Sequence, residues 1–288
     1  MNNENKNIDL NNSRPDGEDN FFNKVELPFG KSKTEVWETM ADKLDKKDET
    51  RSTSLIPSRL WFGLAATILV LAGIFSVMRF YTTSIHNPSG QHLSAILPDG
   101  SVVEMNAQST INYHPFWWQF YRELSFEGEA FFKVQKGEQF EVNSAKGKTI
   151  VLGTSFNIYS RDNAYKVSCL SGKVKVISTT KDEAILSPGY QAEVEQEGSI
   201  KVFKNKQATQ SVSWREGMFT FTSTPLIEVI LEIERQYNIT ISLNTETAYF
   251  YTGYFSREKP VEEVLDLICK TFGLTFEKKS RNDFQINE

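Results

Sequence analysis

An uncharged apolar run constrains this chain more than any other feature of its sequence. Nineteen residues from Leu60 to Met78 carry no charge, and Arg59 and Arg79 flank them. At about 1.5 Å per residue, a helix of this length spans roughly 28 Å, close to the thickness of a bilayer's hydrocarbon layer. The run is apolar on every face, unlike the single stripe of a surface helix. We therefore predict one transmembrane helix at residues 60–79, in preference to a buried core helix.

The distribution of basic residues predicts the orientation of this helix. The twenty residues before the span contain five Lys or Arg side chains, and no Lys or Arg follows Arg79 until Arg122. Since basic residues accumulate on the cytoplasmic side, we expect a cytoplasmic N-terminus and a periplasmic portion from residue 80 to residue 288. The expected location is the bacterial inner membrane. The five basic residues are Lys43, Lys46, Lys47, Arg51 and Arg59.

Composition excludes two classes of protein. The formal net charge is −5, whereas a nucleic-acid-binding surface needs a basic footprint. Two cysteines are too few for a disulfide framework. Cys169 and Cys269 each continue an apolar pattern, so we expect both to be buried as small hydrophobic residues.

The cytoplasmic tail, residues 1–58, holds one convincing helix. Its first thirty residues are polar and rich in Asn, and we expect no packed structure there. Ser32 and Glu35 then have the spacing of a capping box. The following helix would carry an apolar stripe with nothing in the tail to bury it. We favour a docking helix for a cytoplasmic partner over a helix that rests on the membrane surface. The stripe consists of Val36, Trp37, Met40 and Leu44.

From residue 90 to residue 200 the apolar pattern has a period of two. Examples are the runs at residues 124–134, 150–158 and 190–194, and turn signals such as Pro98-Asp99-Gly100 separate them. Many short half-buried strands with tight turns predict an all-β domain, either a sandwich, a roll or a solenoid.

Residues 217–288 contain an internal repeat of 35 residues. Pro225 and Pro260 occupy equivalent positions, and each is followed by about twelve residues with a helical apolar stripe and then by a strand. With strands at 218–222 and 249–255, we predict a small α+β domain made of two βαβ repeats, with both helices on one face of one sheet.

Residues that could perform chemistry are few. His86, His92 and His114 are scattered, and no cluster has metal-ligand spacing, so we expect neither a metal site nor a cofactor. Glu127 and Glu129 would share one face of a strand, loosely at the spacing of a glycosidase pair. The alternation of the strand favours a solvated face instead, and we expect no enzyme.

Two aromatic clusters have alternative interpretations. The run at residues 114–121, HPFWWQFY, is either a stacking platform for a glycan, centred on Trp117 and Trp118, or a loop that packs on the β core. We favour packing. The second cluster lies on a strand of which only one side can be buried, so it offers aromatic surface to a partner. Its candidate partner-binding residues are Tyr249, Tyr251, Tyr254 and Phe255.

The segments of the β domain resemble the FecR family of anti-sigma regulators, in the form common in Bacteroidetes. The resemblance covers about two thirds of the chain, and the βαβ repeats are similar to the short N-terminal domain of secretins and TonB-dependent receptors. The likeness rests on LPDGSVVEMNAQSTI (97–111), LSFEGEAFFKV (124–134), FEVNSAKGKTIVLGTSFNI (140–158), VSCLSGKVKV (167–176) and LSPGYQAEV (186–194).

This resemblance implies a relay across the cell envelope. The signalling domain of an outer-membrane TonB-dependent transporter would contact the periplasmic part, and the tail would control an extracytoplasmic-function sigma factor. Some members cleave themselves at a Gly-Thr in the position of Gly153-Thr154. Many have a longer helical domain before the span, so sigma binding here would rest on the stripe in the tail. The alternative is a membrane-anchored glycan- or protein-binding module without sigma control.

Overall fold

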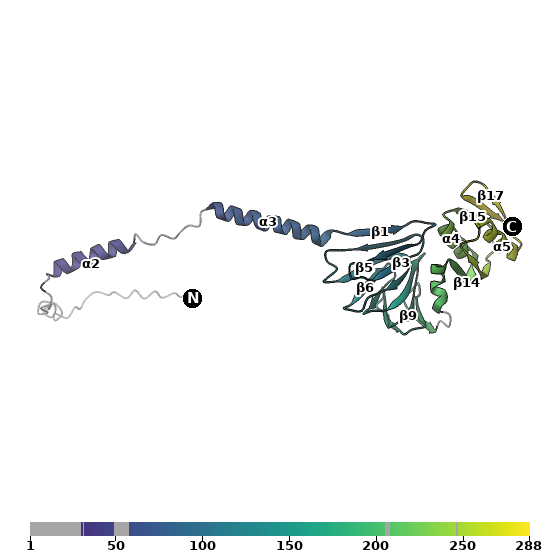
Figure 1. Ribbon diagram of the computed structural model, residues 1–288. Coiled ribbons are helices and arrows are strands. Elements are labelled where there is room, and N and C mark those ends of the chain that lie inside the picture. The colour runs from purple at the N-terminus through teal and green to yellow at the C-terminus, as the bar shows by residue number, and fades with distance from the viewer. Residues whose placement is uncertain (1–29, 31, 49–57, 205–207, 246) are drawn as a thin grey trace, which may run out of the picture. The chain divides into compact units, whose positions relative to one another are not determined.

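The structure is a computed structural model, and it describes residues 30, 32–48, 58–204, 208–245 and 247–288 (Figure 1). The Asn-rich stretch that we expected to lack packed structure lies outside these residues. The chain divides into two compact units, residues 1–69 and residues 70–288. Helix α3 begins in the first unit and ends in the second.

The tail contains the expected helix, α2 (Lys33–Asp48). The hydroxyl oxygen of Ser32 accepts a hydrogen bond from the backbone N–H of Glu35 at 3.4 Å. This contact satisfies one of the amides that a helix start leaves unpaired, as the capping spacing predicted.

Helix α3 (Ser58–Phe80) contains the apolar run. By length and composition, it is the one helix in the described part of the chain that could cross a membrane, over Leu60–Phe80 with a mean hydropathy of 2.2. The bounds of this candidate segment differ by one residue from those of the predicted span, residues 60–79.

The β domain follows α3 after two residues and begins at Thr83, earlier than the predicted residue 90. Its described strands form a thirteen-stranded sheet. They are β1 (Thr83–Asn87), β2 (Leu93–Ile96), β3 (Val102–Met105), β4 (Ser109–Tyr113), β5 (Arg122–Lys133), β6 (Phe140–Ser144), β7 (Gly147–Val151), β8 (Ser155–Arg161), β9 (Ala164–Ser171), β10 (Val174–Ser178), β11 (Glu183–Leu186), β12 (Tyr190–Val194) and β13 (Ile200–Lys204).

The long strand β5 joins two halves of this sheet. Its first part pairs with β4 and, in parallel, with β6, and this half continues through β7 and β10 to β11. Its second part pairs with β3 and β8, and this half continues through β9 and β12 to β13. Gly128 lies at the change of partners with a φ of 115°, a conformation that favours glycine.

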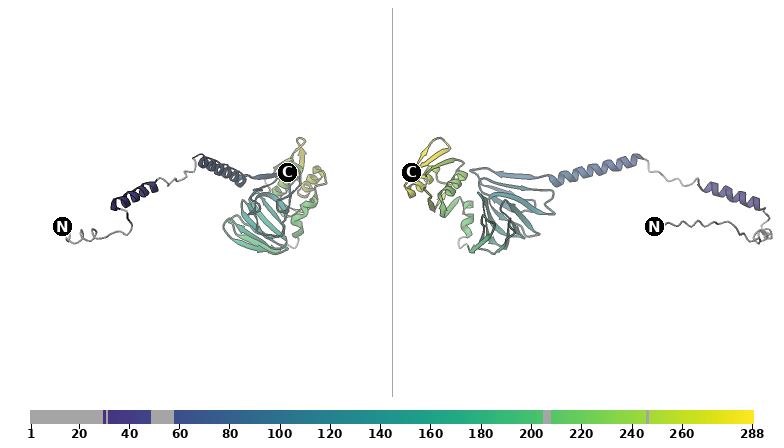
Figure 2. Two further views of the ribbon diagram at one scale, coloured as in Figure 1. Left: turned by 60° about the vertical axis from the view of Figure 1, so that its left-hand side comes forward. Right: turned by 180° about the vertical axis from the view of Figure 1, so that it is seen from behind.

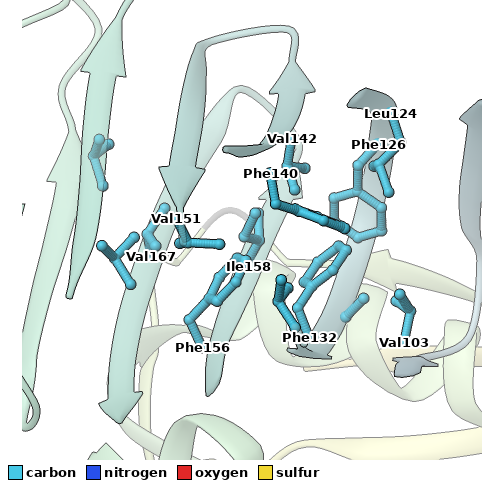
Figure 3. Packing of buried hydrophobic residues seen from close by; sticks show 14 of the residues in the cluster. Val103, Leu124, Phe126, Phe132, Phe140, Val142, Val151, Phe156, Ile158 and Val167 are labelled. Carbon is cyan, nitrogen blue, oxygen red and sulfur yellow. The ribbon is translucent and has the colours of Figure 1, made fainter. Parts of the chain in front are cut away.

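One hydrophobic core draws on both halves. Phe126 and Phe132 from β5 meet edge to face with ring centroids 5.4 Å apart, and Phe132 stacks on Phe156 at 5.1 Å. Figure 3 shows these rings between the strands together with Phe140, Val142 and Val167. Cys169 lies in the same core, and Cys269 in the C-terminal one; both are free thiols, as expected.

The C-terminal domain contains the two predicted βαβ repeats. Both helices follow a proline and end at a residue in the left-handed region, Asn238 or Gly273, which suits a helix C-terminus. Its helices and strands form a group beside the long strands (Figure 2). The elements are η1, a 3-10 helix (Ala208–Glu216), β14 (Met218–Pro225), α4 (Leu226–Tyr237), β15 (Thr240–Asn244), β16 (Phe250–Ser256), α5 (Val261–Phe272), β17 (Thr275–Lys278) and β18 (Asp283–Asn287).

The predicted single sheet is wrong for this domain. Strands β14 and β16 pair only with each other among the described residues, while β15, β18 and β17 form a second sheet. The additional strand β18 pairs with β15 in parallel and with β17 antiparallel, so it lies between the final strands of the two repeats. Its inward residues Phe284 and Ile286 are buried, which explains why the chain continues past the second repeat.

Candidate functional sites

The apolar stripe of α2 is exposed along one face of the helix. The side chains of Trp37, Met40 and Leu44 are 72%, 56% and 65% exposed, and Val36 is half-buried. Residues at these spacings lie on one side of a helix, and an apolar face of this kind fits a hydrophobic groove of a partner. Charged residues, among them Glu38 and Asp42, occupy the opposite side.

The aromatic strand β16 divides between core and surface. Tyr251 and Phe255 are buried, and their alternating positions face the helices of the domain, although both also line the cavity described below. That they contact a partner stays a prediction. Tyr249 is half-buried against Phe272, with ring centroids 4.8 Å apart. Tyr254 is exposed, and so is Phe250, which belongs to the same aromatic cluster but was not among the predicted partner-binding residues.

The exposed side of β16 has two features of a protein-binding surface. Beside Tyr254 lies a cavity of about 690 Å³, lined also by Met218, Leu267 and Lys270. In addition, β16 pairs with one strand only among the described residues, β14, so its other edge has no strand paired to it. An open edge next to exposed aromatic side chains can accept an additional strand.

A polar network connects the β domain to the C-terminal domain. The carboxylate of Glu129 on β5 accepts hydrogen bonds from the side-chain amides of Asn106 (2.8 Å) and Asn157 (3.0 Å). The side-chain amide of Gln236 on α4 donates to the oxygen of Asn106 at 2.8 Å and to the carboxylate of Glu232 at 2.7 Å. The hydrogen bonds therefore run without a break from the β sheet into α4.

The charged side chains of this network form ion pairs with one another. Arg235, which is buried, pairs with Glu232 at 2.9 Å and with Asp162 of the β domain at 3.4 Å. Burial, and then the nearby charge of Glu232, raise the pKa of Glu129 to about 7, although Arg161 and the two asparagines oppose the shift. Glu129 therefore keeps its proton to a higher pH than an exposed glutamate does.

Glu129, which was expected on a solvated face, is instead half-buried. Glu127 is exposed as expected, but the C-terminal domain covers the same face of β5 two residues later. Phe131 also lies on this face and packs in the C-terminal core, with the guanidinium of Arg215 4.1 Å above its ring. Phe131 could have indicated from the sequence that this face is covered, because an apolar residue there interrupts the alternation of apolar and polar positions.

The Gly153-Thr154 junction has an unusual conformation. Gly153 has a φ of 147°, and a Cβ atom there would lie 2.7 Å from the Cα atom of Lys136. Thr154 is buried, and its hydroxyl has no hydrogen-bond partner among the described residues. Since a buried hydroxyl without a partner costs free energy, it is an exception that needs an explanation.

The aromatic run at 114–121 packs only in part. Trp118 lies in the β core, in edge contact with Phe140 at 5.7 Å, as the packing interpretation predicted. Phe116, Phe120 and Tyr121 are instead 50%, 65% and 65% exposed. Trp117 is half-buried against α3.

Within the described residues, no group of three or more His, Cys, Asp or Glu side chains is arranged to hold a metal ion. The three histidines lie apart: His92 contacts Gln236, His86 contacts Thr110, and His114 lies in the aromatic run.

Two family models match the chain. Residues 83–175 match the model described as FecR protein, and residues 218–285 match the model of the FecR C-terminal region. The first match begins at the first residue of β1, and the second begins with β14. No curated protein matches the chain.

Solved structures match over both domains. Two crystal structures, each of a proposed anti-sigma factor from Parabacteroides distasonis ATCC 8503, superpose with TM-scores of 0.66 and 0.65. Each is 30% identical to this chain, and the match covers 72% of this chain and 99% of the other.

Proposed function

The chain belongs to the FecR family of anti-sigma regulators, and on this premise we propose that it carries a signal across the inner membrane. In this proposal α2 binds an extracytoplasmic-function sigma factor in the cytoplasm. The β domain and the C-terminal domain lie in the periplasm, where they receive a signal from a TonB-dependent transporter of the outer membrane. The basic residues that precede the span support this orientation.

The exposed stripe of α2 carries the proposal for sigma binding. Trp37 alone offers a large aromatic surface, and aromatic side chains dominate the binding energy of many interfaces. An isolated helix of sixteen residues is marginal in water, so binding in a groove would also stabilise it.

The test is retention of sigma factors by the full chain in detergent. Each extracytoplasmic-function sigma factor of the same genome would be offered to the wild-type chain and to the double variant Trp37→Ala/Met40→Ala. We expect one sigma factor to be retained by the wild type and its affinity to fall at least tenfold in the variant. A matched control, Glu38→Gln/Asp42→Asn, changes the opposite face and should retain it. Equal retention by all three chains would contradict the proposal.

On the periplasmic side, the exposed face of β16 is the proposed contact for the transporter's signalling domain. Phe250 and Tyr254 supply apolar surface there, and the open edge of the strand supplies unpaired backbone groups. Tyr251 and Phe255 support the strand from inside the domain.

If this contact exists, substitutions of exposed apolar residues in the same domain should differ in their effect on binding. Phe250→Ala/Tyr254→Ala should weaken binding of a purified transporter signalling domain, whereas Ile227→Ala, at an exposed position on α4, should not. If no signalling domain binds the wild type while a glycan does, the alternative of an envelope binding module is correct.

Self-cleavage at Gly153-Thr154 is a second proposed activity. The hydroxyl oxygen of Thr154 would attack the carbonyl carbon of Gly153, the C–N bond would break, and the proton would pass to the released amine. Water would then hydrolyse the ester, leaving a carboxylate on Gly153 and a new N-terminus at Thr154. The unpartnered hydroxyl and the φ of 147° support this proposal.

Mass spectrometry of the purified chain tests the cleavage. We expect fragments 1–153 and 154–288 from the wild type, slower formation from Thr154→Ser, and none from Thr154→Val, which keeps the shape and removes the nucleophile. An intact wild-type chain after prolonged incubation in vesicles would refute self-cleavage and leave the proposal on sigma binding untouched.

A further inference from the structure

The aromatic run contacts the end of the apolar helix. The ring of Trp117 meets Phe75 of α3 edge to face, with centroids 5.7 Å apart. The guanidinium of Arg79 lies 5.3 Å from the centroid of Trp117, which is a cation–π contact. Phe116 lies against Tyr81, the first residue after α3, with ring centroids 5.5 Å apart.

Hydrogen bonds hold the run in this position. The Nδ1–H group of His114 donates to the carbonyl oxygen of Tyr81 at 3.0 Å. The backbone N–H groups of Phe120 and Tyr121 both donate to the carbonyl oxygen of Trp117, at 3.0 and 3.1 Å. The run is therefore a closed turn fixed to the chain at the end of α3.

The contact with Phe75 sets the depth of Trp117. The apolar segment ends at Phe80, five residues beyond Phe75, so Phe75 lies about 7.5 Å inside that end of the segment. The 21-residue segment is about 31 Å long and matches a hydrocarbon layer of about 30 Å. A ring in contact with Phe75 must then lie at or below the membrane surface.

The chemistry of the run suits lipid. Between Glu104 and Arg122 the chain has no Asp, Glu, Lys or Arg residue. Trp and Tyr are the residues most enriched where the headgroups meet the hydrocarbon, and Arg79 can direct its charge to lipid phosphates. A water-soluble partner could not reach rings that lie at the depth of the bilayer, so lipid is the better occupant of this surface.

We propose that the turn at residues 114–121 is a second membrane contact, in which Phe116, Trp117, Phe120 and Tyr121 enter the boundary between headgroups and hydrocarbon. This holds the β domain against the bilayer that α3 crosses. The proposal requires α3 to span the membrane, but it is independent of the sigma factor and of the periplasmic partner.

Spin labels on the full chain in vesicles of phosphatidylethanolamine and phosphatidylglycerol test the proposal. Single cysteines would replace Phe120, Phe80 at the end of the span, or Phe250 in the C-terminal domain. The native thiols are buried, and burial raises the pKa of Cys169 and of Cys269 to about 11, so they should remain unlabelled. The measured quantity is the ratio of collision rates with oxygen, which concentrates in lipid, and with a water-soluble nickel chelate.

We expect the ratio for Phe120→Cys to be close to that of Phe80→Cys and at least threefold above that of Phe250→Cys. A label in place of Phe116 provides a second reading if the first variant folds poorly. A ratio equal to that of Phe250→Cys would mean that the turn lies in water and would overturn the proposal. Low collision rates with both reagents would also overturn it, because another protein or a second copy would then cover the turn.

Discussion

At the scale of single residues, Glu129 has an environment that penalises its charge. Its carboxylate accepts hydrogen bonds from two asparagines, lies near the carboxylate of Glu232, and has Arg161 as a nearby cation. The raised pKa of about 7 means that the folded chain keeps a proton that the unfolded chain, with a pKa of about 4.3, releases.

This shift predicts that stability decreases with pH. Between about pH 4.3 and pH 7 the folded state binds more protons at Glu129 than the unfolded state does, so the free energy of unfolding falls as pH rises, by about 2–3 kcal/mol in all. The variant Glu129→Gln should lose most of this slope. Urea denaturation followed by circular dichroism at several pH values measures it.

Glu127→Gln is the matched control for this measurement, since Glu127 is exposed on the same strand. It should retain the wild-type slope. A Glu129→Gln variant with an unchanged slope would mean that Glu129 is ionised in the folded chain at acidic pH.

At the scale of elements, β5 depends on Gly128. The backbone there has a φ of 115°, and an added Cβ atom would lie 2.6 Å from the Cα atom of Ser109 on β4. Both the added Cβ atom and the Cα atom of Ser109 are fixed by the backbone of paired strands, so neither can move away as the end of a flexible side chain could. One residue therefore allows a single strand to serve both halves of the sheet.

We expect Gly128→Ala to destabilise the chain by about 3–5 kcal/mol, the sum of backbone strain and overpacking. Gly189→Ala is the control, because Gly189 also has a positive φ, 83°, but nothing lies near its missing side chain. That change should cost only about 1–2 kcal/mol of strain. Thermal unfolding of the two variants should separate them clearly; equal losses would show that the close approach of β4 contributes nothing.

At the scale of the whole molecule, the proposal places sigma binding on the cytoplasmic side of the membrane and signal reception on the periplasmic side. Alkaline phosphatase is active only after export to the periplasm, so its fusion after Glu288 tests the orientation. We expect high activity in this fusion and none when the enzyme is fused directly after Asp48, before the span. The reverse pattern would place α2 outside the cytoplasm and remove its access to a sigma factor.

Local patterns predicted the elements of this molecule well. The capping pair Ser32 and Glu35 marked α2, and the equivalent prolines Pro225 and Pro260 marked α4 and α5. Which strands pair is not a local property. Strand β18 pairs between β15 and β17, and these three strands form a sheet separate from β14 and β16. No turn signal or apolar period in the sequence indicates this pairing.

The candidate sites were less predictable, because burial depends on what covers a face. Alternation along β16 distinguishes Tyr251 from Tyr254, but it does not say which of the two faces inward. Glu129 and Glu127 look equivalent until the C-terminal domain covers one of them. In the aromatic run, Trp118 packs in the core as expected. Phe116, Phe120 and Tyr121 are exposed, and in our proposal they contact lipid, which no pattern in the run predicts.

The short connection between α3 and β1 has a mechanical consequence. Tyr81 and Thr82 alone separate them, so tension on the helix would reach β1 with little slack. Strand β1 lies at a sheet edge, pairs only with β4 among the described strands, and has no fully buried residue before Asn87, so we expect it to yield before the core does. Peeling would stop at Asn87, whose buried amide donates to the carbonyl oxygens of Gln91, Met105 and Asn106. We therefore expect the four residues of β1 before Asn87 to detach under load while the core behind them stays folded.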